Sequence, residues 1–272
     1  MPPILDGQNQ SDPNLFRHYV IPDQEGYYHI EDMRFIEHQY KLFFGTEEEQ
    51  ELARNAINSK SKRWPHGVLP YKFNPSVTAA NQKKIKNCMA KFNTHFQNCI
   101  NVRYLLTSIG SFVSYNLYFA FREKTSTDIH FVAITPWYTG CWSPVGKQGG
   151  RQELNLQPGY PGCMDCRFVW DIISIIMSLH EVICKFNHSS RTIMHEFMHA
   201  LGLYHTQSRP DRDDYVEIKW DNIQKEMQYA YYKCKDCLTY NVGYDAKSIM
   251  HYKSSGYAID KSKPTMVSKV VE

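Results

Sequence analysis

The sequence carries little net charge. Its 31 Lys and Arg residues against 28 Asp and Glu residues give a formal charge of +3 over 272 residues. There is no block of like charge beyond Glu47-Glu48-Glu49. Surfaces that bind nucleic acids need clustered positive charge, so we expect no nucleic-acid partner.

A hydrophobic run long enough to span a bilayer is also missing. The most apolar stretch, residues 168–184, contains Asp171, His180 and Glu181. It is shorter than the roughly 20 apolar residues that a membrane helix needs. We therefore expect no membrane association.

No signal peptide is recognisable at the start, since residues 1–7 lack a basic region followed by an apolar one. The eight cysteines nevertheless predict an oxidising compartment with disulfides. We therefore expect a secreted, extracellular protein whose export signal is missing from this sequence.

What the sequence does contain is a dense histidine motif over residues 195–205, HEFMHALGLYH. His195 and His199 lie four residues apart, so on a helix they share one face and can reach one ion. Gly202 can end that helix in a left-handed conformation, which lets His205 approach the same ion from outside. Three imidazoles leave one tetrahedral position open for water, as in catalytic zinc sites. Glu196 is then placed to act as general base, and we expect one Zn²⁺ per chain.

Two other interpretations of the histidines and cysteines need to be weighed. An amphipathic helix with scattered surface histidines would explain neither Gly202 nor His205. A structural zinc module could use the pairs Cys163-x-x-Cys166 and Cys234-x-x-Cys237. The chain between these pairs is too long for a zinc ribbon, so disulfides are the better interpretation.

Hydrophobic periodicity predicts a mixture of helices and strands. A stripe of apolar residues at three- and four-residue steps favours a helix over residues 77–99. Residues 153–156 are typical of a strand, and we consider an edge strand that could hold an extended peptide. Further helices are expected around 47–55 and over 190–203 and 220–233, and further strands over 102–106, 113–121 and 128–134.

The histidine motif, the turn SRPDRD at 208–213 and the sequence SIMHY at 248–252 together resemble the astacin family of metzincin zinc metalloendopeptidases. Residues 63–71, RWPHGVLPY, are similar to the opening of an astacin catalytic domain. The resemblance covers roughly residues 55–256. It implies an α+β fold with two subdomains: a twisted sheet with the active-site helix above it, and an irregular lower subdomain with a Met-turn.

The resemblance also implies a role for each matching residue. Glu196 would be the general base and would later pass its proton to the leaving amine. Tyr252 would ligate zinc at rest and stabilise the oxyanion during catalysis. The implied zinc ligands are His195, His199 and His205, above the Met-turn residue Met250.

Residues 1–54 resemble an astacin propeptide, in which an aspartate replaces the catalytic water and keeps the zymogen silent. Asp32 matches that aspartate, although Glu31 stands where the family's element has glycine. The other candidate element, residues 43–46, lacks an aspartate. The resemblance further implies cleavage between Arg54 and Asn55 by a trypsin-like protease.

Residues 55–272 would form the catalytic domain, with three departures from the family. Thr206 stands where many members have a glutamate that pairs with the mature N-terminus. A segment of about residues 166–187 looks like an insertion. The domain is also expected to be truncated at its C-terminus, and this truncation removes the partner of Cys99. The resemblance implies a disulfide between Cys141 and Cys163. It assigns no partner to Cys88, Cys99, Cys166 or Cys184.

We therefore expect a secreted zinc endopeptidase, made as a zymogen, that hydrolyses protein or peptide substrates. The alternative is a catalytically impaired relative that only binds. The complete set of His195, Glu196, His199, His205 and Tyr252 counts against that alternative.

Overall fold

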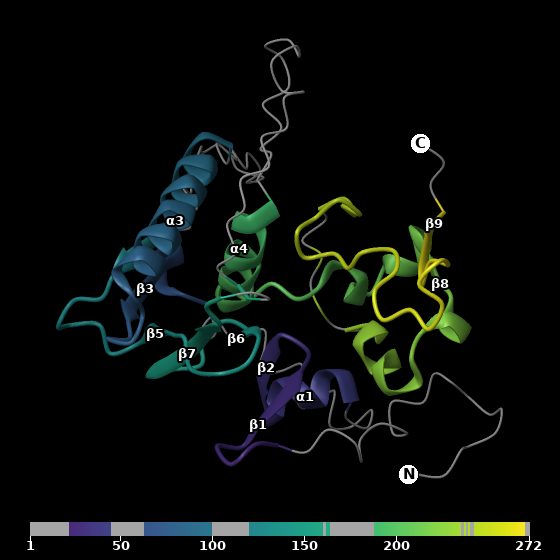
Figure 1. Cartoon of the computed structure of the whole chain (residues 1–272), viewed down its shortest axis with the longest axis horizontal. Helices are drawn as coiled ribbons and strands as arrows, with labels where there is room; N and C mark the ends of the chain where they lie inside the picture. The colour runs from purple at the N-terminus through teal and green to yellow at the C-terminus, as the bar shows by residue number, and fades with distance from the viewer. Residues whose placement is uncertain are drawn as a thin grey trace, which may run out of the picture. The chain divides into compact units, whose positions relative to one another are not determined.

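A computed structural model describes residues 22–44, 63–99, 120–159, 162–163, 188–234, 237, 239 and 242–269. The chain divides into two compact units. One unit is formed by residues 60–203, and the other by residues 1–59 together with residues 204–272. Figure 1 labels the elements of both.

A sheet of five described strands forms the core of the unit 60–203. Its strand order is β6-β7-β5-β3-β4. Parallel pairing joins β4 to β3, β3 to β5 and β5 to β7, and β6 runs antiparallel to β7. The strands are β3 (Val68–Phe73), β4 (Ala120–Glu123), β5 (Phe131–Thr135), β6 (Cys141–Pro144) and β7 (Arg151–Leu156).

The helix α3 (Ala79–Cys99) follows β3 in the chain (Figure 1), which confirms the expected helix over 77–99. Its apolar stripe packs inward, since Ile85, Met89 and Phe92 are at most 3% exposed. The Phe92 ring lies 5.0 Å from the Phe121 ring of β4. Burial of this stripe removes apolar surface from water and so holds the helix on the sheet.

A second helix, α4 (His188–Leu201), confirms the expected helix over 190–203 to within two residues at each end. Ile193, Met194 and Phe197 are completely buried, and the Phe197 ring lies 4.8 Å from that of Phe121. Near its C-terminus, the indole Nε1 of Trp64 donates a hydrogen bond of 2.7 Å to the Ala200 carbonyl. That bond satisfies a carbonyl that the helix end would otherwise leave unpaired.

Two expectations about secondary structure were wrong. The strand containing residues 153–156 is not an edge, because β7 pairs with β5 on one side and β6 on the other. The expected helix over 220–233 is replaced by two short 3-10 helices, Trp220–Asn222 and Lys225–Tyr231. Between them, Ile223 has extended backbone and forms a bridge to Ala258, which interrupts the helix.

The other unit combines an N-terminal hairpin with a largely irregular C-terminal body. The hairpin pairs β1 (Tyr27–Ile30) with β2 (Met33–Ile36), followed by α1 (Glu37–Phe44). The body includes a two-stranded sheet of β8 (Val216–Ile218) and β9 (Met266–Ser268). The apolar core of the body consists of Val216, Ile218, Ile223, Ala230, Tyr231 and Met266.

Sheet, helices and irregular body together give the α+β fold that the sequence indicated. Several expectations lie outside the described residues: the propeptide cleavage site at Arg54 and Asn55, the insertion at about 166–187, the helix around 47–55 and the strand over 102–106. Among the described residues, no helix is both long and apolar enough to cross a membrane.

Candidate metal centre and active site

The two α4 histidines turn their side chains toward the same point. His195 Nε2 and His199 Nε2 are 3.0 Å apart, and the two rings are perpendicular with centroids 4.6 Å apart. Nitrogens that share one tetrahedral zinc ion at about 2.0–2.1 Å lie roughly 3.3 Å from each other. The spacing of the two imidazoles therefore fits a shared zinc ion.

Backbone contacts fix the orientation of His199. Its Nδ1 lies 2.7 Å from the Leu203 carbonyl oxygen, so the N–H is at Nδ1 and Nε2 is left as the metal-binding nitrogen. The His199 carbonyl in turn accepts hydrogen bonds from the backbone N–H groups of Gly146 and Gly202, at 2.9 and 2.8 Å. The end of α4 is thereby fixed to the loop that follows β6.

Glu196 follows the first of these histidines and is only 1% exposed. A carboxylate on the same helix as two metal-binding imidazoles, shielded from bulk water, can accept a proton from a reacting water. The position of Glu196 in the sequence and its burial therefore suit a general base.

Gly202 ends α4 with a φ of +109°, a conformation that side chains of L-residues rarely adopt. A Cβ at this position would lie 3.8 Å from the Gly146 Cα, so the space is adequate and the backbone conformation is what requires glycine. The helix ends here, three residues before His205.

We expect Gly202→Ala to lower the free energy of unfolding by about 1–3 kcal/mol, the cost of holding a non-glycine residue in a disfavoured conformation. Urea denaturation followed by circular dichroism measures this change. Gly243→Ala is the matched control, because Gly243 has no such φ and open space around it; its effect should stay within about 0.5 kcal/mol. Equal effects of the two substitutions would contradict the argument.

His205 belongs to the other unit, where its side chain is fully buried. Its Nε2 lies 3.1 Å from Asp32 Oδ1, and its Nδ1 lies 3.9 Å from Glu31 Oε2. The His205 ring is 4.7 Å from the ring of Tyr252. The turn of the N-terminal hairpin and the residues His205 and Tyr252, which are distant from it in the sequence, therefore lie together.

Met250 and Tyr252 are held close to His205 by hydrogen bonds to the two residues that follow it in the chain. The N–H of Thr206 donates to the Met250 carbonyl at 2.8 Å, and the N–H of Tyr252 donates to Gln207 Oε1 at 3.2 Å. Met250 is only 2% exposed. The hydroxyl of Tyr252 is buried and makes no hydrogen bond within the described residues. An unpaired buried phenol costs stability, as expected of a group reserved for a ligand or substrate.

Asp32 is presented to His205 by the tight turn of the N-terminal hairpin. Glu31 and Asp32 are the two residues between β1 and β2, and Glu31 adopts a φ of +57°. That is the left-handed conformation for which the family's glycine would be suited. The hairpin is tied to the segment before it by Arg34, whose Nη2 lies 2.8 Å from Asp23 Oδ2 and 2.7 Å from Glu25 Oε2.

The second carboxyl of this turn was not expected from the sequence. The Glu31 side chain is only 4% exposed. Burial raises the pKa of Glu31 to about 9, with a further contribution from the charge of Asp32, while the Tyr257 hydroxyl opposes the rise. The mismatch with the family's glycine was the one signal in the sequence that marked this position.

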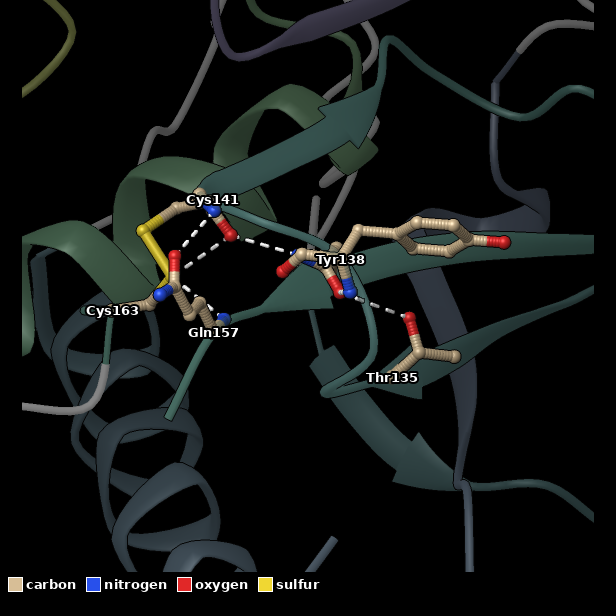
Figure 2. Close-up of a disulfide and its surroundings, with 7 residues drawn as sticks. Thr135, Tyr138, Cys141, Gln157 and Cys163 are labelled. Atoms are coloured by element: carbon tan, nitrogen blue, oxygen red, sulfur yellow. Dashed lines mark hydrogen bonds between the residues drawn. A yellow bond between two sulfur atoms is a disulfide. The ribbon is translucent and has the colours of Figure 1, made fainter. Parts of the chain in front are cut away.

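The cysteines form two disulfides within the described residues. Cys141, at the start of β6, is joined to Cys163 (Figure 2). Nearby backbone bonds run from Gln157 N to the Gly140 carbonyl and from Cys163 N to the Gln157 carbonyl. The second disulfide joins Cys234 to Cys237. Three of the four cysteines of the alternative zinc module are therefore oxidised, while Cys166 lies outside the described residues. Cys88 is buried in α3.

Comparisons with known proteins agree with this chemistry. The model of the astacin peptidase family matches residues 56–182 and 177–272. Zinc metalloproteinase nas-15 of Caenorhabditis elegans is 30% identical over 79% of this chain and 29% of its own length. Blastula protease 10 of Paracentrotus lividus has the same identity and coverage. This chain thus spans less than a third of either relative.

A solved structure supports the same assignment. High choriolytic enzyme 1, a hatching enzyme zinc-protease of Oryzias latipes, is 27% identical with a TM-score of 0.54, over 79% of this chain and 83% of its own. The fold and the imidazole pair define a metzincin-like zinc-binding domain. The chain belongs to the astacin family of peptidases, whose cofactor is one zinc ion.

Proposed function

We propose that this chain is a secreted zinc endopeptidase, made as a zymogen, that hydrolyses internal peptide bonds of proteins or peptides. The observation that carries the proposal is the pair of α4 imidazoles, whose Nε2 atoms are 3.0 Å apart beside the buried Glu196. Membership of a peptidase family supports it. Secretion is supported by the two disulfides.

His195, His199 and His205 would hold the zinc ion. Only five residues separate His199 from His205, and the left-handed Gly202 lies among them, so the chain can return to an ion bound by the helix. When bound, zinc lowers the pKa of water and polarises a carbonyl group. The remaining chemistry belongs to side chains of this protein.

Glu196 would take the proton of the attacking water and later deliver it to the leaving amine. Tyr252 would donate a hydrogen bond from its hydroxyl to the carbonyl oxygen as negative charge develops there. Burial and the absence of a competing hydrogen bond within the described residues keep this hydroxyl available. Met250 would pack beneath the imidazoles as a hydrophobic floor.

Latency would come from Asp32. Its carboxylate already contacts the Nε2 of His205, the atom that must bind zinc. Cleavage between Arg54 and Asn55 by a trypsin-like protease would release the segment that carries Asp32. The untreated chain is therefore expected to be silent.

Zinc content and casein hydrolysis, measured before and after trypsin treatment, test the proposal. We expect one zinc ion per chain and hydrolysis only after treatment. Removal of zinc by 1,10-phenanthroline should stop hydrolysis, and added zinc should restore it. A treated chain that holds one zinc ion and hydrolyses neither casein nor a peptide library would instead establish the alternative, a catalytically impaired binding protein.

A further inference from the structure

The Gln207 side chain is completely buried, two residues after His205. Its amide oxygen accepts the backbone N–H of Tyr252 at 3.2 Å. Its amide nitrogen, in contrast, is buried and has no hydrogen-bond partner among the described residues. A buried donor without an acceptor lowers stability, and an apolar side chain of the same shape would avoid that loss. The contribution of this amide is therefore its oxygen, and the oxygen holds Tyr252.

The backbone of Gln207 has a support of its own. Its carbonyl accepts a hydrogen bond of 2.9 Å from Nη1 of Arg212, whose side chain is only 4% exposed. The same nitrogen donates to the Tyr231 carbonyl, and Nε of Arg212 lies 2.8 Å from Asp213 Oδ1. Hydrogen bonds from a charged guanidinium are stronger than neutral ones. The amide oxygen of Gln207 therefore starts from a well-fixed main chain.

The carbonyl side of Tyr252 is held by His251. The Nδ1 of His251 lies 2.8 Å from the Tyr252 carbonyl oxygen, and its Nε2 lies 2.7 Å from the Tyr244 hydroxyl. A carbonyl oxygen can only accept, so the ring N–H is at Nδ1 and the Tyr244 hydroxyl donates to Nε2. The Tyr244 ring is stacked on Tyr215, with centroids 4.8 Å apart. The position of the His251 ring is thereby set from its far side.

Side chains thus bind both main-chain groups of Tyr252, which lies in neither a helix nor a strand. We call Gln207 and His251 the Tyr252 clamp. The Tyr252 ring is packed as well, with the rings of His205 and Tyr231 at 4.7 and 5.5 Å. The hydroxyl at its end makes no hydrogen bond within the described residues. A donor held in place before the reaction can stabilise charge on a carbonyl oxygen without first reorganising.

We propose that Gln207 and His251 are positioning residues for peptide hydrolysis, which act by fixing the backbone of Tyr252. This inference rests on the proposed peptidase function. Neither side chain has to touch the substrate, because each acts through the Tyr252 hydroxyl. That hydroxyl matters most in the transition state, so loss of the clamp should lower kcat and leave KM nearly unchanged.

Gln207→Met removes the amide oxygen and keeps the length of the side chain. We expect kcat of the trypsin-treated chain to fall on the order of tenfold with an unchanged KM, as a small displacement of a catalytic group allows. Gln228→Met is the matched control, because Gln228 is a 7% exposed glutamine of the same body whose amide nitrogen donates to the Trp220 carbonyl at 3.1 Å. Its kcat should not change. Equal losses in the two variants would overturn the proposal.

A double-mutant cycle separates positioning from general damage to the fold. Tyr252→Phe is measured alone and together with Gln207→Met. If Gln207 acts through the Tyr252 hydroxyl, its replacement lowers kcat no further once that hydroxyl is gone. The same loss in both backgrounds would show a merely structural role and sink the proposal. An unmodified treated chain that cleaves no peptide would instead refute the proposed peptidase function.

Tyr244→Phe tests the carbonyl side of the clamp. It removes the hydroxyl that sets the His251 ring and keeps the ring that stacks on Tyr215. We expect kcat to fall severalfold, again with no further effect in the Tyr252→Phe background. A kcat equal to that of the unmodified chain would overturn the role of His251.

Hydrogen exchange tests the clamp without turnover. Exchange of the Tyr252 amide proton is followed by NMR in the full, uncleaved chain. We expect Gln207→Met to speed this exchange on the order of tenfold, because the N–H loses its acceptor, and Gln228→Met to leave it unchanged. An unchanged rate at Tyr252 in Gln207→Met would contradict the clamp.

Discussion

Replacing Glu196 by alanine is expected to lower kcat/KM of the trypsin-treated chain by on the order of 10²- to 10⁴-fold, the usual contribution of a general base. Zinc content should stay at one ion per chain, because the proposed ligands are three histidines. Because Glu196 is only 1% exposed, a carboxylate on the protein surface cannot easily take its place. Hydrolysis of a quenched fluorescent peptide and metal analysis of the same sample measure the two quantities.

Glu196→Gln is the control that keeps the size and shape of the side chain. Glutamine fills nearly the same volume and keeps hydrogen-bonding capacity, but it cannot accept a proton at neutral pH. We therefore expect the same loss of activity with an unchanged unfolding transition. Turnover by either variant at the rate of the unmodified chain would refute the mechanism, and loss of zinc together with activity would show that Glu196 supports the metal site instead.

Local patterns predicted the two long helices of this fold, α3 and α4, but the helix expected over 220–233 was wrong. The stripe of Ile85, Met89 and Phe92 marks α3, and the apolar residues between the histidines mark α4, because helical periodicity is a property of neighbouring residues. The place of β7 in the sheet could not be predicted in the same way. It depends on pairing with β5 and β6, and strand order is set by contacts between distant parts of the chain.

The candidate site shows the same difference between features set by neighbouring residues and features set by distant contacts. The four-residue spacing of His195 and His199 already places them on one helix face, so the motif predicted their convergence. The backbone conformations of Glu31 and Tyr257 could not be predicted, since both are non-glycine residues with left-handed backbone, at φ values of +57° and +51°. Such conformations persist only where surrounding contacts impose them, and those contacts come from residues far away in the sequence.

Asp32→Ala is expected to make the uncleaved chain active. The test compares both chains with Arg54→Gln added, so that trypsin-like proteases cannot process them at the proposed site. In the unmodified chain the Asp32 carboxylate contacts His205 Nε2 at 3.1 Å, which would keep water and substrate from the metal. Alanine removes that carboxylate, and peptide hydrolysis should rise on the order of 10²-fold, as when a centre occupied about 99% of the time becomes open.

Glu25→Ala is the matched control for this prediction, because it removes another acid from the same N-terminal segment. The Glu25 side chain is 64% exposed and contacts Arg34 rather than His205, so the uncleaved chain with this substitution should stay silent. Asp32→Asn should give intermediate activity, because an amide oxygen is a weaker ligand than a carboxylate. An uncleaved Asp32→Ala chain as silent as the unmodified one would show that steric cover by the hairpin, rather than the carboxylate, maintains latency.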